Sequence, residues 1–151
     1  MRFLMVCLGN ICRSPLAHGI LEAKIAQHGL PWTVDSAGTS GWHSGGCPDG
    51  RSMAVAKKYG LDISGQCSRQ FRHYDFEAFD VIYVMDRSNL SNVLALAATA
   101  EERAKVKMIL NEIYPGQNKE VPDPYYDDNG FEEVYDMLER ACEAVVRRYK
   151  N

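Results

Sequence analysis

The sequence lacks any apolar run near the roughly 20 residues that a membrane-spanning helix requires. Its first residues, Met1 to Cys7, carry one basic residue and lead directly into Gly and Asn, without the long apolar core of a secretion signal. It also lacks an excess of positive charge, because 17 Lys and Arg against 20 Asp and Glu leave a net charge of −3. These absences predict a cytoplasmic protein that binds neither a membrane nor nucleic acid.

Cysteine and histidine are present, but not in the patterns of a disulfide framework or a metal site. The five cysteines are odd in number, widely spaced and without a C-x-x-C pair, and the four histidines form no H-x-x-x-H pair. We therefore expect no metal and no cofactor. The 151 residues, 46% of them hydrophobic, are enough for one domain over residues 1–151 and too few for two of ordinary size.

Short apolar runs alternate with helical patterns along the chain. The predicted strands are Phe3–Val6, Trp32–Gly38, Val81–Met85 and Val106–Leu110. The predicted helices are Pro15–His28, Arg51–Tyr59, one turn at Asp75–Ala78, Ser88–Ala97 and Phe131–Tyr149, with Ala100–Arg103 as a bridge. This alternation predicts a single-domain α/β fold, a doubly wound four-stranded parallel sheet with helices on both faces. Ligands of such sheets bind beyond the carboxyl ends of the strands.

The most informative stretch runs from Cys7 to Pro15, between the first predicted strand and the first predicted helix, with Pro15 at the first helical position. A strand, a short loop and a helix N-terminus form an anion site, because loop N–H groups and the helix dipole face the same point. A nearby positive charge and a helix N-terminus stabilise a thiolate, so they favour the ionised form of Cys7. The planar guanidinium of Arg13 can bind a phosphate with two parallel hydrogen bonds. The stretch predicts a phosphate-binding loop after the first strand, with Cys7 as a nucleophile.

The remaining loop residues have supporting roles to offer. The phosphate-binding loop would comprise Leu8, Gly9, Asn10, Ile11, Cys12 and Ser14. Asn10 tolerates the left-handed turn that such a loop needs, and Ser14 can donate a hydrogen bond to the sulfur of Cys7. Asp86 follows the third predicted strand, where orienting Arg13 and capping the next helix are equally good interpretations.

Phosphoryl transfer from a phosphate monoester also needs a general acid. Asp123 is the best candidate, since prolines flank it and its loop returns to the same sheet edge. Taken alone, Pro122–Tyr126 would be an ordinary turn; together with the first loop, the acid is the better interpretation. Trp42 lies in a loop rich in Gly and Ser, where it either lines a binding wall or anchors the loop in the core.

These segments together resemble the low-molecular-weight protein tyrosine phosphatases. The resemblance rests on Cys7-x5-Arg13-Ser14 within Val6–Pro15 and on Asp123–Tyr126, and it extends to Asp35–Thr39, Ser68–Gln70 and Met85–Leu90. It implies a metal-free phosphatase that forms a phosphocysteine on Cys7, binds phosphate with Arg13 and uses Asp123 as acid and then base. By the same resemblance, Trp42, Tyr125 and Tyr126 wall a slot for phosphotyrosine, and Cys12 forms a reversible disulfide with Cys7.

The resemblance also implies partners and one departure. Phosphotyrosine-containing proteins would be substrates, a tyrosine kinase would act on Tyr125 or Tyr126 as in some relatives, and the chain would be a monomer or weak dimer. Many relatives carry a His shortly before the segment that corresponds to Ser68–Gln70, whereas this chain has Gly65, Gln66 and Cys67 there. Either Gln66 replaces it as a hydrogen-bonding support, beside the supporting residues Ser36 and Asp86, or the loop is held less rigidly.

Three other functions share parts of this pattern. Thioredoxin-coupled arsenate reductases need further cysteines after the third strand, and Val81–Ile109 has none. Phosphocysteine carrier domains need no general acid, so the combination of Arg13 and Asp123 disfavours them. A non-catalytic phosphotyrosine-binding module would not need both Cys7 and Asp123.

Overall fold

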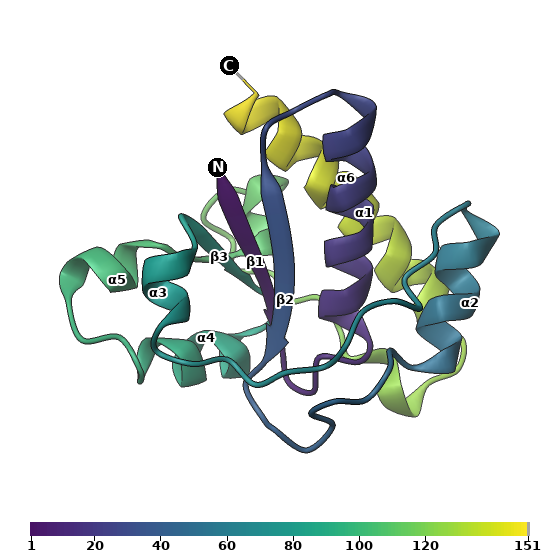
Figure 1. Cartoon of the computed structure of the whole chain (residues 1–151), viewed down its shortest axis with the longest axis horizontal. Coiled ribbons are helices and arrows are strands. Elements are labelled where there is room, and N and C mark those ends of the chain that lie inside the picture. Colours follow the sequence, from purple (N-terminus) through teal and green to yellow (C-terminus); the bar gives the residue numbers. More distant parts are fainter. Residues whose placement is uncertain (151) are drawn as a thin grey trace.

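Four apolar segments pair side by side as a parallel sheet in the order β2-β1-β3-β4. The computed structural model describes residues 1–150. The strands are β1 (Arg2–Cys7), β2 (Thr33–Gly38), β3 (Val81–Val84) and β4 (Val106–Met108). The carboxyl ends of β1 and β2 meet at the lower edge of the view in Figure 1. The parallel four-stranded α/β sheet predicted from the sequence is confirmed.

Helices cover both faces of the sheet, because alternate residues of the central strand β1 belong to different cores. Phe3 and Met5 lie in the core beneath α1 (Arg13–Gln27), α2 (Gly50–Lys58) and α6 (Phe131–Tyr149). Leu4 and Val6 lie in the core on the other face, covered by α3 (Asp75–Ala78) and α4 (Arg87–Leu94). These two groups of helices stand on opposite sides of the strands in Figure 1. Among residues 1–150, no helix combines the length and the apolarity needed to cross a membrane.

Several element boundaries differ from the sequence-based prediction. α1 begins at Arg13, so Pro15 is its third residue rather than its first; a proline is tolerated there because the first four N–H groups of a helix have no partner within it. β4 stops at Met108, and the predicted end of that strand forms the 3-10 helix η1 (Ile109–Glu112). The predicted bridge is the short helix α5 (Ala100–Ala104), capped by Thr99.

One sheet edge collects the chemically interesting segments. Cys7 ends β1, and Asp86 comes two residues after β3. The connection after η1 returns to this edge, because the N–H of Val121 donates to the carbonyl of Met85 over 2.8 Å. The 3-10 helix η2 (Pro124–Tyr126), which follows Asp123, is placed there as a result.

Candidate active site

The loop between β1 and α1 presents backbone N–H groups that the fold leaves unpaired. The N–H groups of Gly9, Asn10, Ile11 and Cys12 have no hydrogen-bond acceptor among residues 1–150. Asn10 adopts the left-handed conformation expected for it, with φ of 55°. Successive free N–H groups at the start of a helix form an anion-binding site. This backbone is therefore shaped to hold a phosphate.

Gly38, at the end of β2, allows this loop to pass close to the sheet. A Cβ at this position would lie 2.8 Å from the carbonyl oxygen of Leu8 and 3.0 Å from the backbone nitrogen of Asn10. Both distances are shorter than ordinary van der Waals contacts. Any larger residue at position 38 would push the loop away from β2.

Cys7 lies at the bottom of the loop with only 2% of its surface exposed. Its Sγ is 3.1 Å from the hydroxyl of Ser14. The hydroxyl oxygen of Ser14 in turn accepts a 2.8 Å hydrogen bond from the side-chain amide of Asn10. Because its oxygen already accepts from Asn10, Ser14 can direct its own proton at the sulfur.

Arg13 is buried and held in one position by its partners. Its Nη1 donates to Oδ2 of Asp86 over 2.7 Å and to the backbone carbonyl of Val121 over 2.9 Å. Burial opposes the charge, but Cys7 and the two nearby carboxylates raise the pKa of Arg13 overall, so it stays cationic. Asp86 fulfils both roles considered from the sequence, since its Oδ1 accepts from the N–H of Asn89 and caps α4.

Asp123 forms the turn that the sequence suggested and also faces the site. Its Oδ1 accepts from the N–H of Tyr125 over 3.1 Å and shapes the turn of η2. Its Oδ2 lies 3.6 Å from Nη2 of Arg13. One carboxylate oxygen thus organises the loop while the other faces the site.

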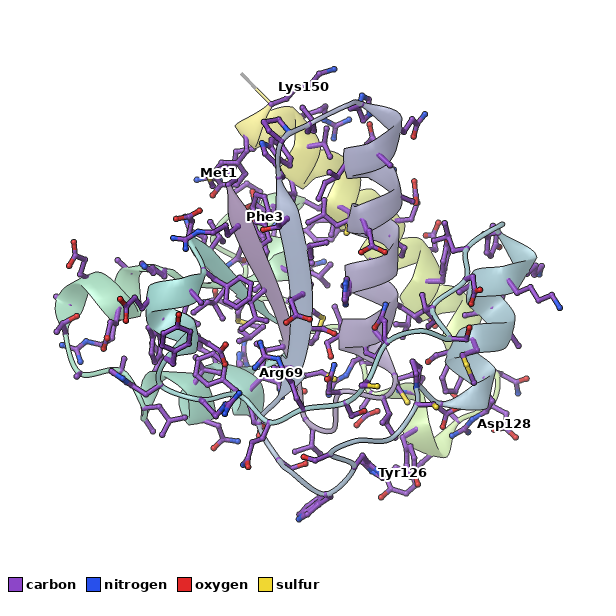
Figure 2. The ribbon with its side chains drawn as sticks, viewed as in Figure 1. Met1, Phe3, Arg69, Tyr126, Asp128 and Lys150 are labelled. Carbon is purple, nitrogen blue, oxygen red and sulfur yellow. The ribbon has the colours of Figure 1, made fainter. Side chains whose placement is uncertain are left out.

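A cavity of about 210 Å³ opens above the loop. Its lining combines the loop with the two later segments: Cys7, Leu8, Gly9, Ile11, Cys12, Arg13, Trp42, His43, Asp123, Tyr125 and Tyr126. Trp42 is 79% exposed and Tyr126 is 92% exposed, so both stand at the mouth, and the alternative that Trp42 anchors the core is wrong. Figure 2 shows Tyr126 among the loops below the carboxyl ends of the strands.

The segment 66–69 supports the loop, but largely through residues that sequence reasoning did not select. The hydroxyl of Ser68 donates to the backbone carbonyl of Asn10 over 2.7 Å. The N–H of Arg69 donates to the side-chain oxygen of Asn10 over 3.1 Å. Gln66 donates instead to the carbonyl of Pro15, at the start of α1. Through this bond Gln66 supports the start of α1 rather than the loop directly. Its Oε1 is buried without a hydrogen-bond partner among the described residues.

Ser36 and His43 lie in places that the sequence did not predict. Ser36, expected to support the loop, bonds to Nδ1 of His18 over 3.0 Å and joins β2 to α1 instead. His43 lines the cavity although no sequence motif singled it out. Nor could a motif reveal the carbonyl of Val121 on Arg13, because every residue has a carbonyl.

Cys12 lies beside Cys7 in the loop and is buried. Burial first, and then the nearby Asp49, Cys7 and Asp123, raise the pKa of Cys12 to about 12. Cys12 is therefore a neutral thiol at physiological pH. Among residues 1–150, no group of three or more His, Cys, Asp or Glu side chains is placed to hold a metal ion.

Comparison with known proteins gives one consistent result. A family model described as low molecular weight phosphotyrosine protein phosphatase matches residues 2–151. A Synechocystis sp. protein, provisionally named a low molecular weight protein-tyrosine-phosphatase, is 48% identical over 94% of this chain and 92% of its own. A crystal structure of a protein tyrosine phosphatase from Entamoeba histolytica has a TM-score of 0.92 at 37% identity, covering 99% of this chain and 97% of that one.

A second solved structure has the same fold under a different description. It is titled DARP, a Drosophila arginine phosphatase, and it has a TM-score of 0.92 at 33% identity, covering 100% of this chain and 99% of that one. The resemblance inferred from the first loop and the Asp-Pro-Tyr-Tyr segment is confirmed by the family match over nearly the whole chain. The chain belongs to the low molecular weight phosphotyrosine protein phosphatase family.

Proposed function

We propose that this protein hydrolyses phosphotyrosine on proteins through a phosphocysteine intermediate on Cys7. In this proposal Arg13 binds the phosphate, and Asp123 acts as general acid and then as general base. The observation that carries it is that Cys7, Arg13, Asp123 and the unpaired loop N–H groups border one cavity.

In the first step the thiolate of Cys7 attacks phosphorus, and the bond from phosphorus to the phenolic oxygen breaks. The phosphoryl oxygens are held by the loop N–H groups and by Arg13, which are fixed before the substrate arrives. Preorganised donors of this kind stabilise the charge that develops in the transition state. The proton of Asp123 passes to the leaving phenolate, so tyrosine departs neutral.

In the second step Asp123, now ionised, takes a proton from a water molecule that attacks phosphorus. The bond from phosphorus to sulfur breaks, and Cys7 leaves as a thiolate. The hydroxyl of Ser14, 3.1 Å from the sulfur, stabilises that thiolate. The position of Asp123 on the cavity wall, with Oδ2 facing the site, suits both proton transfers.

The cavity walls support an aromatic substrate. Trp42, Tyr125 and Tyr126 contribute flat side chains around an opening whose floor is the phosphate loop. Aromatic pairs contribute about 0.5–1.5 kcal/mol beyond the area that they bury. A phosphotyrosine ring gains this contribution, whereas a phosphoarginine side chain presents no apolar aromatic face.

The experiment is a comparison of Cys7→Ser and Asp123→Asn with the wild type on a phosphotyrosine peptide, p-nitrophenyl phosphate and a phosphoarginine peptide. We expect Cys7→Ser to abolish turnover. Asp123→Asn should lower kcat by about 10²–10⁴-fold, least for p-nitrophenyl phosphate, because its good leaving group needs the acid least. Asp127→Asn is the matched control, since this exposed carboxylate lies outside the cavity.

Three outcomes would contradict this assignment. An active Cys7→Ser protein would exclude the nucleophile, and equal activity of the Asp123→Asn and Asp127→Asn proteins would exclude the acid. A higher kcat/KM for the phosphoarginine peptide would overturn the substrate class.

The finer features of the proposal concern regulation and surroundings. Tyr126 and the half-buried Tyr125 are accessible at the mouth, where a tyrosine kinase could phosphorylate them. Hydrogen peroxide would oxidise the thiolate of Cys7 to a sulfenic acid as the peroxide O–O bond breaks and hydroxide leaves. The neutral thiol of Cys12 would then attack that sulfur and release water, which forms a reversible disulfide. A nucleophilic thiol needs a reducing compartment, which supports a location in the cytoplasm. The exposed aromatic side chains at the cavity mouth would form the contact surface of a weak dimer at most.

A further inference from the structure

Two exposed cysteines, Cys47 and Cys67, lie outside the catalytic cavity. Cys47 belongs to the loop after β2, which carries Trp42 and His43 to the cavity wall. Cys67 belongs to the segment between α2 and α3, next to Ser68, which holds the phosphate loop. The catalytic steps use neither thiol.

Backbone hydrogen bonds join these two segments in a defined geometry. The N–H of Gly45 donates to the carbonyl of Ser68, and the N–H of Ser68 donates to the carbonyl of Gly46, both over 2.8 Å. Two consecutive residues therefore oppose one residue of the partner segment. Gly45 has a φ of 84°, the left-handed conformation that a G1 bulge requires of its first residue. The two segments thus run antiparallel at Ser68.

Continued by one residue beyond its last hydrogen bond, this register would place Cys47 opposite Cys67. Gly46 and Ser68 are the last hydrogen-bonded partners, so the residue after Gly46 faces the residue before Ser68. In an antiparallel ladder this next pair lacks hydrogen bonds and has Cα atoms about 4.5 Å apart, with side chains on the same face. A disulfide needs a Cα separation of about 4.4–6.8 Å. With the separation of an ideal antiparallel ladder, the two exposed thiols would lie within bonding range.

We propose that Cys47 and Cys67 form a disulfide-forming thiol pair, oxidised by small-molecule disulfides and independent of Cys7 and Cys12. The thiolate of one cysteine attacks the small disulfide, whose S–S bond breaks and releases one small thiolate. The thiolate of the other cysteine then attacks the protein sulfur of this mixed disulfide and releases the second small thiolate. Two protein thiols are oxidised, and one small disulfide is reduced to two thiols.

The cross-link would tie the loop that carries Trp42 to the segment that supports Asn10. It closes a loop of about 20 residues, and constraining a loop of this size in the unfolded chain corresponds to a rise in Tm of about 5–10 °C. Neither sulfur lines the cavity, so we expect kcat to stay nearly unchanged. The pair would act as a reversible clamp on the wall loop.

The test equilibrates the full chain with oxidised glutathione, blocks free thiols and maps tryptic peptides by mass spectrometry without reduction. We expect residues 25–51 and 59–69 to appear as one cross-linked species, two hydrogens lighter than the sum of the two peptides. Cys7 and Cys12 share a different peptide, so a bond between them gives a separate signal. Oxidised wild type should melt about 5–10 °C above the reduced protein, and reductant should reverse the shift.

The matched control moves one thiol out of register without changing the number of cysteines. In the Cys67→Ser/Ser64→Cys protein the exposed thiol lies three residues earlier, so Cys47 should carry a glutathione adduct and no cross-link. Glutathione on both Cys47 and Cys67 of the wild type, instead of a bond between them, would overturn the proposal. An equal yield of cross-link in the control, or a cross-link only between two copies of the chain, would also overturn it.

Discussion

At the scale of single residues, Asp86 and Asp123 each use one carboxylate oxygen to accept from the backbone and the other to face Arg13. Asp86 caps α4 with Oδ1 and holds Arg13 with Oδ2. Asp123 shapes η2 with Oδ1 and faces Arg13 with Oδ2. An Asn substitution retains the oxygen that accepts from the backbone but removes the charge. This is why Asp123→Asn, rather than Asp123→Ala, separates proton transfer from loop folding.

Trp42 provides a prediction at the same scale. It stands exposed at the cavity mouth, so Trp42→Ala should change the free energy of unfolding by less than about 0.5 kcal/mol. Loss of the aromatic wall should raise KM for aryl phosphates by about 3–10-fold, since stacking contributes about 0.5–1.5 kcal/mol. Steady-state kinetics and denaturant unfolding of one preparation measure both. A large loss of stability with unchanged KM would show that Trp42 is a structural anchor.

At the scale of elements, the segment 66–69 connects the sheet to the phosphate loop. The N–H of Gly38 donates to the carbonyl of Arg69, which attaches the segment to the end of β2, where Figure 2 shows Arg69. From there Ser68 and Arg69 reach Asn10, while Gln66 reaches the start of α1. The loop is thus held by a short extended segment from outside the β1–α1 unit.

Because Ser68 contacts the phosphate loop and Gln66 contacts α1, substitutions at the two positions should have different effects. Ser68→Ala leaves the carbonyl of Asn10 without its donor, so we expect kcat to fall by about tenfold, the equivalent of about 1–2 kcal/mol. Gln66→Ala should reduce stability by about 1 kcal/mol and leave kcat nearly unchanged, since the amide of Gln66 donates to the carbonyl of Pro15 in α1 and not to the phosphate loop. Kinetics with phosphotyrosine peptide and urea unfolding test the pair. A larger fall in kcat for Gln66→Ala would show that Gln66 is the functional replacement for the family His.

At the scale of the whole molecule, His18 joins α1 to β2 through Ser36. Burial lowers the pKa of His18, although Glu22 and Asp35 act in the opposite direction. The folded protein therefore resists protonation of His18. In the unfolded chain the same side chain has the ordinary pKa of histidine, about 6.5. Since the unfolded state binds more protons below that pH, global stability must fall as the solution is acidified.

The corresponding prediction is a change in the pH dependence of unfolding. Between about pH 6.5 and 5.5 the wild type should lose about 0.5–1 kcal/mol more stability than His18→Gln, and above about pH 7.5 their difference should be constant. Urea unfolding at each pH measures it. Parallel curves for the two proteins, or a wild type that gains stability on acidification, would contradict a buried neutral His18.

Much of this protein could be read from local sequence. Apolar strands and the long stripe of α6, predicted and observed at Phe131–Tyr149, determine the parallel α/β sheet, because burial of periodic apolar side chains is the main driving force. The order Cys7, Asn10, Ser14 determines the shape of the phosphate loop, since Ser14 contacts both Cys7 and Asn10 within a few residues. Asn10 adopts the expected left-handed turn for the same local reason.

Only the tertiary structure decided which distant groups meet at that loop. The Val121 carbonyl on Arg13, the Ser68 hydroxyl on Asn10 and the exposure of Trp42 depend on how separate segments pack. Backbone groups are the same in every residue and leave no motif, so their partners cannot be read from the sequence. The same is true of the proposed pairing of Cys47 with Cys67, which rests on the register that the bulge at Gly45 gives to two loops. The nucleophile and the phosphate-binding loop are therefore local in sequence, whereas Asp123 and the support of the loop reach the site only through the tertiary structure.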